Sequence, residues 1–136
     1  MLALLFPGQG SQFVGMSQFL YKEFSIAKST LQEASDTLGF DMAELLFEDK
    51  AQKLNLTAHT QPALVCASIM YYRAFQQETH LSPTMAAGHS LGEYSALVAN
   101  EVISFADALT LTHARGKAMQ EAVPVGKGSM VAVMGL

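Results

Sequence analysis

Short apolar runs alternate along the chain with longer segments in which apolar residues recur every three or four positions. Apolar runs bounded by turn residues are typical of buried parallel strands, whereas the three-to-four spacing is typical of helices. We therefore expect strands over residues 2–6, 85–87 and 128–133. We expect helices over residues 16–22, 25–38, 42–47, 91–98 and 105–123, a weaker helical turn over 49–54, and one more helix that opens at 60–62. This order of elements predicts an α/β fold with a parallel sheet and flanking helices.

Individual residues mark the ends of several expected helices. Asp41 and Ser104 are expected N-caps. Pro62 is expected in the first turn of its helix, where a missing N–H group costs nothing, and Pro124 is expected to end the last helix. Residues 63–72 are apolar on nearly every side, which predicts a helix buried all round.

Composition narrows the class of protein. The chain has 136 residues, half of them hydrophobic and 15% charged, which suits one domain with a buried core. A net charge of −4 gives no reason to expect a nucleic-acid partner. No apolar run approaches the length of a membrane span, and the apolar N-terminus lacks the basic region of a signal peptide, so we expect a cytoplasmic protein. The single cysteine, Cys66, excludes an internal disulfide and is expected in the core.

Gly88-His89-Ser90-Leu91-Gly92 fits the pattern G-x-S-x-G, which is typical of a nucleophile elbow. In such an elbow, the serine sits on a sharp turn between a strand and a helix, and a Cβ two residues before or after it would find no room. The small-residue strand before the motif and the helix after it, with Glu93 in its first turn, supply that context. The alternative is an ordinary turn with a serine between two glycines.

Arg115 lies on the apolar face of its helix, where a guanidinium group needs an anionic partner. One interpretation pairs it with an internal carboxylate or with carbonyl groups at a helix end. The other gives it the carboxylate of a substrate, held by a bidentate fork. Arg73 is expected at the polar end of its helix, so Arg115 is the arginine to single out. The apolar face on which Arg115 lies consists of Phe105, Ala108, Leu109, Thr112, Gly116, Met119 and Val123.

The loop Gly8-Gln9-Gly10 follows the first expected strand and also allows two interpretations. Its spacing fits neither a dinucleotide fingerprint nor a P-loop. It could supply a backbone N–H group to an oxyanion hole, together with the N–H group of Leu91, which follows the serine. The alternative is a tight turn without a further role.

Taken together, these motifs resemble the malonyl-CoA:acyl carrier protein transacylases, which are similar to the acyltransferase domains of fatty acid and polyketide synthases. Four segments carry the resemblance in the family's order. They are Phe6-Pro7-Gly8-Gln9-Gly10-Ser11-Gln12 with Val14-Gly15-Met16, then Thr60-Gln61-Pro62-Ala63-Leu64, then Gly88-His89-Ser90-Leu91-Gly92-Glu93-Tyr94, and finally Arg115-Gly116 with Met119.

The resemblance implies an acyltransferase of fatty acid biosynthesis that moves malonyl from coenzyme A to the phosphopantetheine thiol of acyl carrier protein through a malonyl-serine ester. Coenzyme A thioester and carrier protein are thus the implied partners, with no nucleic acid, membrane, metal or redox cofactor, and a monomer is expected for the full-length protein. The implied roles are nucleophile for Ser90, oxyanion donors for the amides of Gln9 and Leu91, carboxylate clamp for Arg115, and pocket lining for Gln61 and Met119.

Part of the family's pattern is missing. The resemblance implies a hydrolase-like α/β core over residues 1–125 and the first strand of a small ferredoxin-like subdomain over 126–136. The family is more than twice as long, and its general-base histidine would lie beyond residue 136. His89 is expected to point away from Ser90, and the other three histidines, His59, His80 and His113, are expected at the surface or at helix ends.

Two further hypotheses compete with the malonyl transferase. The elbow also suits a serine esterase or thioesterase, in which water is the acceptor in place of a thiol. The missing histidine suits a catalytically incomplete chain that only binds an acyl-CoA or a partner, because general-base help contributes roughly 10²–10⁴-fold.

Overall fold

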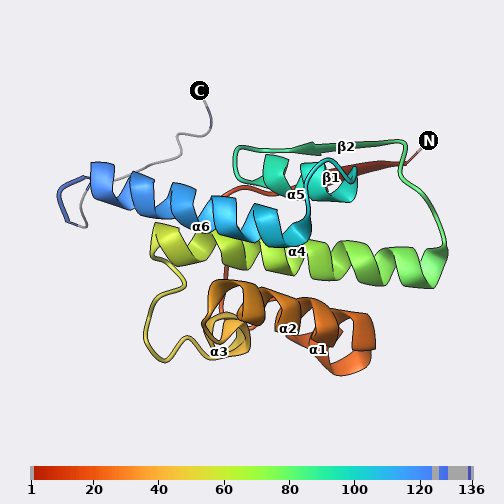
Figure 1. Ribbon diagram of the computed structural model, residues 1–136, viewed down its shortest axis with the longest axis horizontal. Coiled ribbons are helices and arrows are strands. Elements are labelled where there is room, and N and C mark those ends of the chain that lie inside the picture. The colour runs from red at the N-terminus through yellow and green to blue at the C-terminus, as the bar shows by residue number, and fades with distance from the viewer. Residues whose placement is uncertain (1, 124–125, 129–134, 136) are drawn as a thin grey trace.

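The computed structural model describes residues 2–123, 126–128 and 135. Figure 1 shows the long helix α4 (Thr57–Thr79) running through the middle of these residues. On one side of α4 lie the strands, α5 and α6, and on the other side lie α1, α2 and α3. The remaining elements are β1 (Ala3–Phe6), α1 (Gln18–Glu23), α2 (Ser25–Leu38), α3 (Met42–Phe47), β2 (Met85–Gly88), α5 (Gly92–Ala99) and α6 (Phe105–Ala122).

The two strands form a parallel pair in which Phe6 lies opposite Gly88. The expected α/β fold with a parallel sheet and flanking helices is therefore confirmed. The expectation that the first strand is buried is wrong in part, since Phe6 is buried but the Leu5 side chain is 81% exposed. Parallel strands become buried where helices cover both faces of the sheet, and in the described part of the chain α5 is the helix packed against both strands.

Most helices form where the sequence predicts them. The helices α2 and α3 have the expected bounds, and α1, α5 and α6 agree within two residues. Asp41 and Ser104 cap α3 and α6, because their side chains accept hydrogen bonds from backbone N–H groups three residues ahead, at 2.9 and 3.0 Å. Residues 49–54 form hydrogen-bonded turns in place of a helical turn. The strand expected over 128–133 and the helix stop at Pro124 fall outside the described residues, apart from Gly128.

The start of α4 differs from the expectation. The helix begins at Thr57, so Pro62 lies inside it and not in its first turn. The predicted all-round burial is largely confirmed, with Tyr71 as the exposed exception. Cys66 is fully buried as expected, and burial raises the pKa of its thiol to about 12. No helix in the described ranges is long and apolar enough to cross a membrane.

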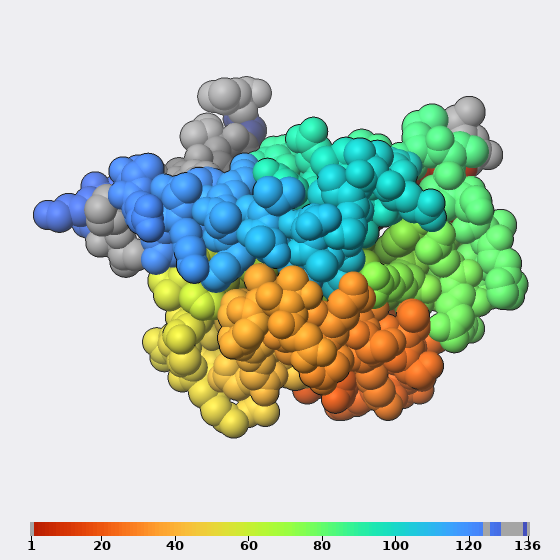
Figure 2. Space-filling model, in the orientation of Figure 1, coloured from red at the N-terminus to blue at the C-terminus, as the bar shows by residue number. Residues whose placement is uncertain are grey.

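Arg73 joins three helices and does not lie at a polar helix end as expected. Its guanidinium group donates to the Glu33 carboxylate at 2.7 Å and to the Thr30 hydroxyl at 3.0 Å, both on α2. It also lies 4.8 Å from the ring centroid of Phe105, the first residue of α6. Figure 2 shows α6 and α2 meeting on one face of the molecule. The contacts of Arg73 with Thr30, Glu33 and Phe105 place its side chain between these two helices.

We predict that Arg73→Lys lowers the free energy of unfolding by about 1 kcal/mol, because an ammonium group cannot bond to both partners and stack on Phe105 at once. Urea unfolding measures the change. Lys50→Ala is the control: Lys50 pairs with Glu48 at the exposed surface, where an ion pair contributes little to stability. Equal losses in the two variants would contradict the structural role of Arg73.

Candidate active site

Ser90 sits on a sharp turn between β2 and α5. Its φ of 51° is in the left-handed region, which a non-glycine residue rarely adopts. The turn is fixed on both sides of the serine: the His89 amide donates to the Phe6 carbonyl at 3.2 Å, and the Gly92 amide donates to the His89 carbonyl at 2.9 Å. Ser90 itself is exposed. The strand, strained serine and helix of a nucleophile elbow are thus all present.

Glycine is required two residues before and two residues after Ser90 because, as predicted, a Cβ at either position would find no room. A Cβ on Gly88 would lie 1.9 Å from the backbone carbon of Gly92, and a Cβ on Gly92 would lie 2.2 Å from the Phe6 carbonyl oxygen. A third close approach was not foreseen from the sequence, since a Cβ on Gly8 would lie 2.7 Å from Nδ1 of His89. The first loop is therefore packed directly against the elbow.

The first loop is also fastened to the segment before α4. The side-chain amide of Gln9 donates to the Thr57 hydroxyl at 3.2 Å, and that of Gln12 donates to Asn55 Oδ1 at 3.0 Å. Within the described residues, the backbone N–H groups of Gln9 and Leu91 donate to no other protein group. The Leu91 side chain is buried in the core and anchors the start of α5. Both amides are therefore without an acceptor in the part of the chain that the structure describes.

Arg115 reaches from α6 to the elbow. One of its terminal nitrogens donates to Oε1 of Gln61 at 2.7 Å, and the other donates to the Ser90 hydroxyl at 3.1 Å. No carboxylate of the described residues forms an ion pair with it. The interpretation in which Arg115 pairs with an internal carboxylate is therefore wrong for this part of the chain, and its hydrogen bonds do not go to helix-end carbonyls either.

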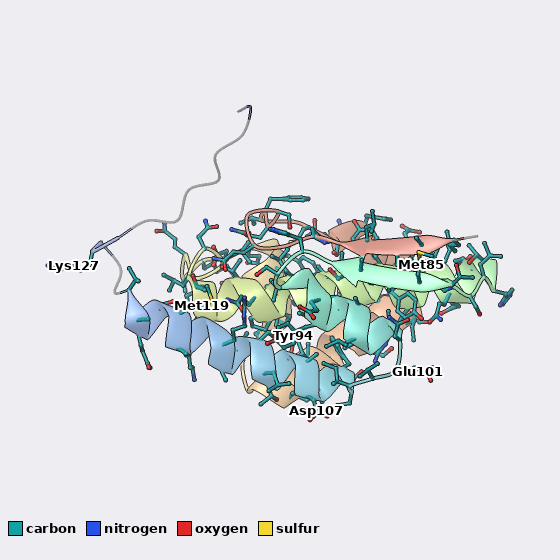
Figure 3. The ribbon with its side chains drawn as sticks, turned by 90° about the horizontal axis from the view of Figure 1, so that it is seen from above. Met85, Tyr94, Glu101, Asp107, Met119 and Lys127 are labelled. Carbon is teal, nitrogen blue, oxygen red and sulfur yellow. The ribbon has the colours of Figure 1, made fainter. Side chains whose placement is uncertain are left out.

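Gln61 extends this contact to Met119. Its side chain is wholly buried, and its amide nitrogen donates to the Met119 sulfur at 3.2 Å. Figure 3 labels Met119 on α6, on the side that faces α4. Ser90, Arg115, Gln61 and Met119, which the sequence singled out separately, thus form one continuous set of contacts across α4, the elbow and α6.

The histidines lie apart from the serine hydroxyl, and none in the described residues hydrogen-bonds to it. His89 packs against Gly8, and His80 ends α4 as an exposed helix-end residue, as expected. His59 and His113 are half-buried with ring centroids 6.0 Å apart, and burial, then the neighbouring His113, lowers the pKa of His59. The expectation of a surface or helix-end position is wrong for His113, which lies within α6. The described residues hold no cluster of three or more metal-ligating side chains.

Comparison with known proteins gives a consistent result. The family model for the acyl transferase domain matches residues 3–135. The chain is 53% identical over 134 residues to the malonyl CoA-acyl carrier protein transacylase of Escherichia coli (strain K12), covering 98% of this chain and 43% of that protein. It therefore spans less than half the length of this curated relative.

Solved structures agree with that match. The malonyl CoA-acyl carrier protein transacylase of Coxiella burnetii has a TM-score of 0.88 at 42% identity, over 92% of this chain and 40% of that one. A malonyl transacylase solved in complex with a holo acyl carrier protein of a type II polyketide synthase has a TM-score of 0.86 at 49% identity. The match covers 90% of this chain and 40% of that chain.

We predict that Gly88→Ala and Gly92→Ala each lower the free energy of unfolding by about 3 kcal/mol or more, because their Cβ atoms would overlap backbone atoms that cannot move aside. Gly10→Ala is the control: its Cβ would meet nothing within 4 Å, so only its φ of 108° opposes the change. That strain costs about 1 to 2 kcal/mol. Urea unfolding of the three variants distinguishes atomic overlap from backbone strain. A loss of unfolding free energy in Gly10→Ala as large as in Gly88→Ala would contradict the prediction.

Proposed function

Because the chain belongs to the acyl transferase domain family, we propose that it supplies the serine, the oxyanion donors and the carboxylate-binding arginine of a malonyl transferase. The proposed reaction moves malonyl from coenzyme A to the phosphopantetheine thiol of acyl carrier protein, as a step of fatty acid biosynthesis. The names of relatives about half identical to this chain support the proposal. So does the similar malonyl transacylase that was solved with its carrier protein.

One observation carries the proposal: a cation without a carboxylate partner in the described residues lies against the proposed nucleophile. Two of the N–H groups of Arg115 are used by Gln61 and Ser90. A guanidinium group has five N–H groups, and the remaining ones can bind a carboxylate in a bidentate fork. Malonyl-CoA carries such a carboxylate two carbons from the thioester carbonyl, so one ligand can reach both Arg115 and Ser90.

The proposed chemistry consists of two acyl transfers. The Ser90 oxygen attacks the thioester carbonyl carbon and loses its proton to a base, the carbon–sulfur bond breaks, and coenzyme A leaves as its thiol after taking up a proton. The carrier's phosphopantetheine thiol then attacks the ester carbonyl carbon and forms the new carbon–sulfur bond. The ester bond to Ser90 breaks, and the serine oxygen takes up the proton that the thiol lost. No redox cofactor is required, because exchange of one thioester for another changes no oxidation state. No histidine of the described residues hydrogen-bonds to the Ser90 hydroxyl, so none of them is assigned as this base.

The amides of Gln9 and Leu91 are the proposed oxyanion hole. They come from two loops that the parallel strands bring to the same edge of the sheet. Fixed N–H groups stabilise the negative oxygen that forms when the carbonyl is attacked, and loss of one such donor costs about 10²–10³-fold in rate in a well-studied protease. Gln61 and Met119 would form the wall of the pocket behind Arg115.

We predict that Arg115→Ala weakens binding of malonyl-CoA by about 10- to 100-fold, since charged hydrogen bonds contribute about 1.5–3 kcal/mol. Binding of acetyl-CoA, which lacks the carboxylate, should be unchanged. Isothermal titration calorimetry with both thioesters measures this without need of a general base. Any malonyl adduct that intact mass spectrometry finds on the wild type after incubation should be absent from Ser90→Ala.

Three results would contradict the proposal. They are equal affinity of the wild type for malonyl-CoA and acetyl-CoA, an equal loss of both in Arg115→Ala, and a malonyl adduct that persists in Ser90→Ala. Steady release of free malonate without carrier protein would instead favour the thioesterase.

A further inference from the structure

Pro62 leaves one carbonyl group of α4 without its usual partner. In an α-helix the N–H group of residue 62 would donate to the carbonyl of residue 58, but proline has no N–H group. In this structure, Nδ1 of His113 lies 2.8 Å from the Ala58 carbonyl oxygen. A carbonyl oxygen only accepts hydrogen bonds, so Nδ1 carries the proton and donates. A side chain of α6 thus takes the place of the missing backbone donor of α4.

Two more residues of α6 hold the same point of α4. A Cβ on Gly116 would lie 2.6 Å from the Ala58 Cα, so the two helix backbones touch there. Gln120 accepts a long hydrogen bond of 3.5 Å from the Ala58 N–H group, which at the start of a helix has no partner within it. His113, Gly116 and Gln120 lie on one face of α6, and we call these three residues the Ala58 clasp.

The proposed binding residues are neighbours of the clasp on both helices. Arg115 lies between His113 and Gly116 on α6, and Gln61 lies one turn after Ala58 on α4, just before Pro62. The hydrogen bond of 2.7 Å between Arg115 and Gln61 therefore depends on how α6 is set against the start of α4. The described residues provide no carboxylate that would hold Arg115 in place by itself.

We propose that His113 is a positioning residue: by donating to the Ala58 carbonyl that Pro62 leaves free, it sets the register of α6 on α4 and so aims Arg115 at the substrate carboxylate. The inference rests on the proposed function of Arg115. His113 itself makes no contact with substrate in this proposal. Its role is to favour a carboxylated acyl group by keeping the Arg115 guanidinium between Gln61 and Ser90.

The test compares a matched pair of variants in binding assays with malonyl-CoA and acetyl-CoA. His113→Asn keeps a donor nitrogen at the position of Nδ1, whereas His113→Leu has a similar shape without a donor. We expect His113→Leu to lower the ratio of malonyl-CoA to acetyl-CoA affinity by roughly three- to tenfold, and His113→Asn to stay within about twofold of the wild type.

A control variant separates the positioning role from a general loss of stability. Leu46→Val is that control, because Leu46 is fully buried in α3, outside the two helices that the clasp joins. A similar drop in the ratio for Leu46→Val would overturn the proposal.

An NMR measurement keeps the inference separable from the proposed function. With ¹⁵N-labelled histidine, above the usual titration range of imidazole, the neutral His113 ring should carry its proton on Nδ1. A proton on Nε2 would overturn the clasp whatever the protein binds. A wild type with no preference for malonyl-CoA would instead overturn the proposed function. A normal preference that survives in His113→Leu would overturn only the positioning role.

Discussion

The close packing of backbone at the elbow is the constraint on which the rest of the site depends. Gly88 and Gly92 let the turn at Ser90 close on itself, and Gly8 lets the first loop lie directly on the elbow. The strand register makes this contact specific, because Phe6 opposite Gly88 brings the loop that starts at Pro7 to the elbow, where Gly8 lies next to His89. A slip of one residue would change which loop amides lie beside Ser90. The two proposed oxyanion donors are therefore paired by the sheet and not by either loop alone.

Features set by neighbours in sequence could be predicted well. The caps of α3 and α6, the bounds of α2 and the strand–turn–helix around Ser90 each depend on residues within a few positions of one another. The start of α4 could not be predicted in this way. Pro62 is tolerated inside the helix because His113, far along the chain, bonds to the carbonyl that proline leaves free. The exposure of Leu5 likewise depends on which elements cover the sheet, and an apolar run does not reveal that.

The two arginines show the same limit for charged residues. Helical spacing identified Arg115 as a cation on an apolar face and placed Arg73 at a polar end, yet Arg73 also lies among packed helices. What separates them is the partner. Arg73 has the Glu33 carboxylate and an aromatic ring, as a structural cation should, whereas Arg115 has an amide oxygen and a hydroxyl. Spacing along one helix cannot predict partners that come from other elements, so the sequence left both interpretations open.

The pairing of Arg115 with neutral groups has an energetic consequence. A guanidinium group that is partly withdrawn from water loses hydration, and neutral acceptors compensate for its charge less than a carboxylate does. Gln61 cannot turn its amide to relieve this, since its nitrogen is directed to the Met119 sulfur and its oxygen is already bonded to Arg115. Proteins keep such unfavourable arrangements mainly at functional sites, where a ligand completes them. The lack of a carboxylate partner for Arg115 among the described residues is therefore the strongest physical support for the proposal that the ligand of this site is an acid.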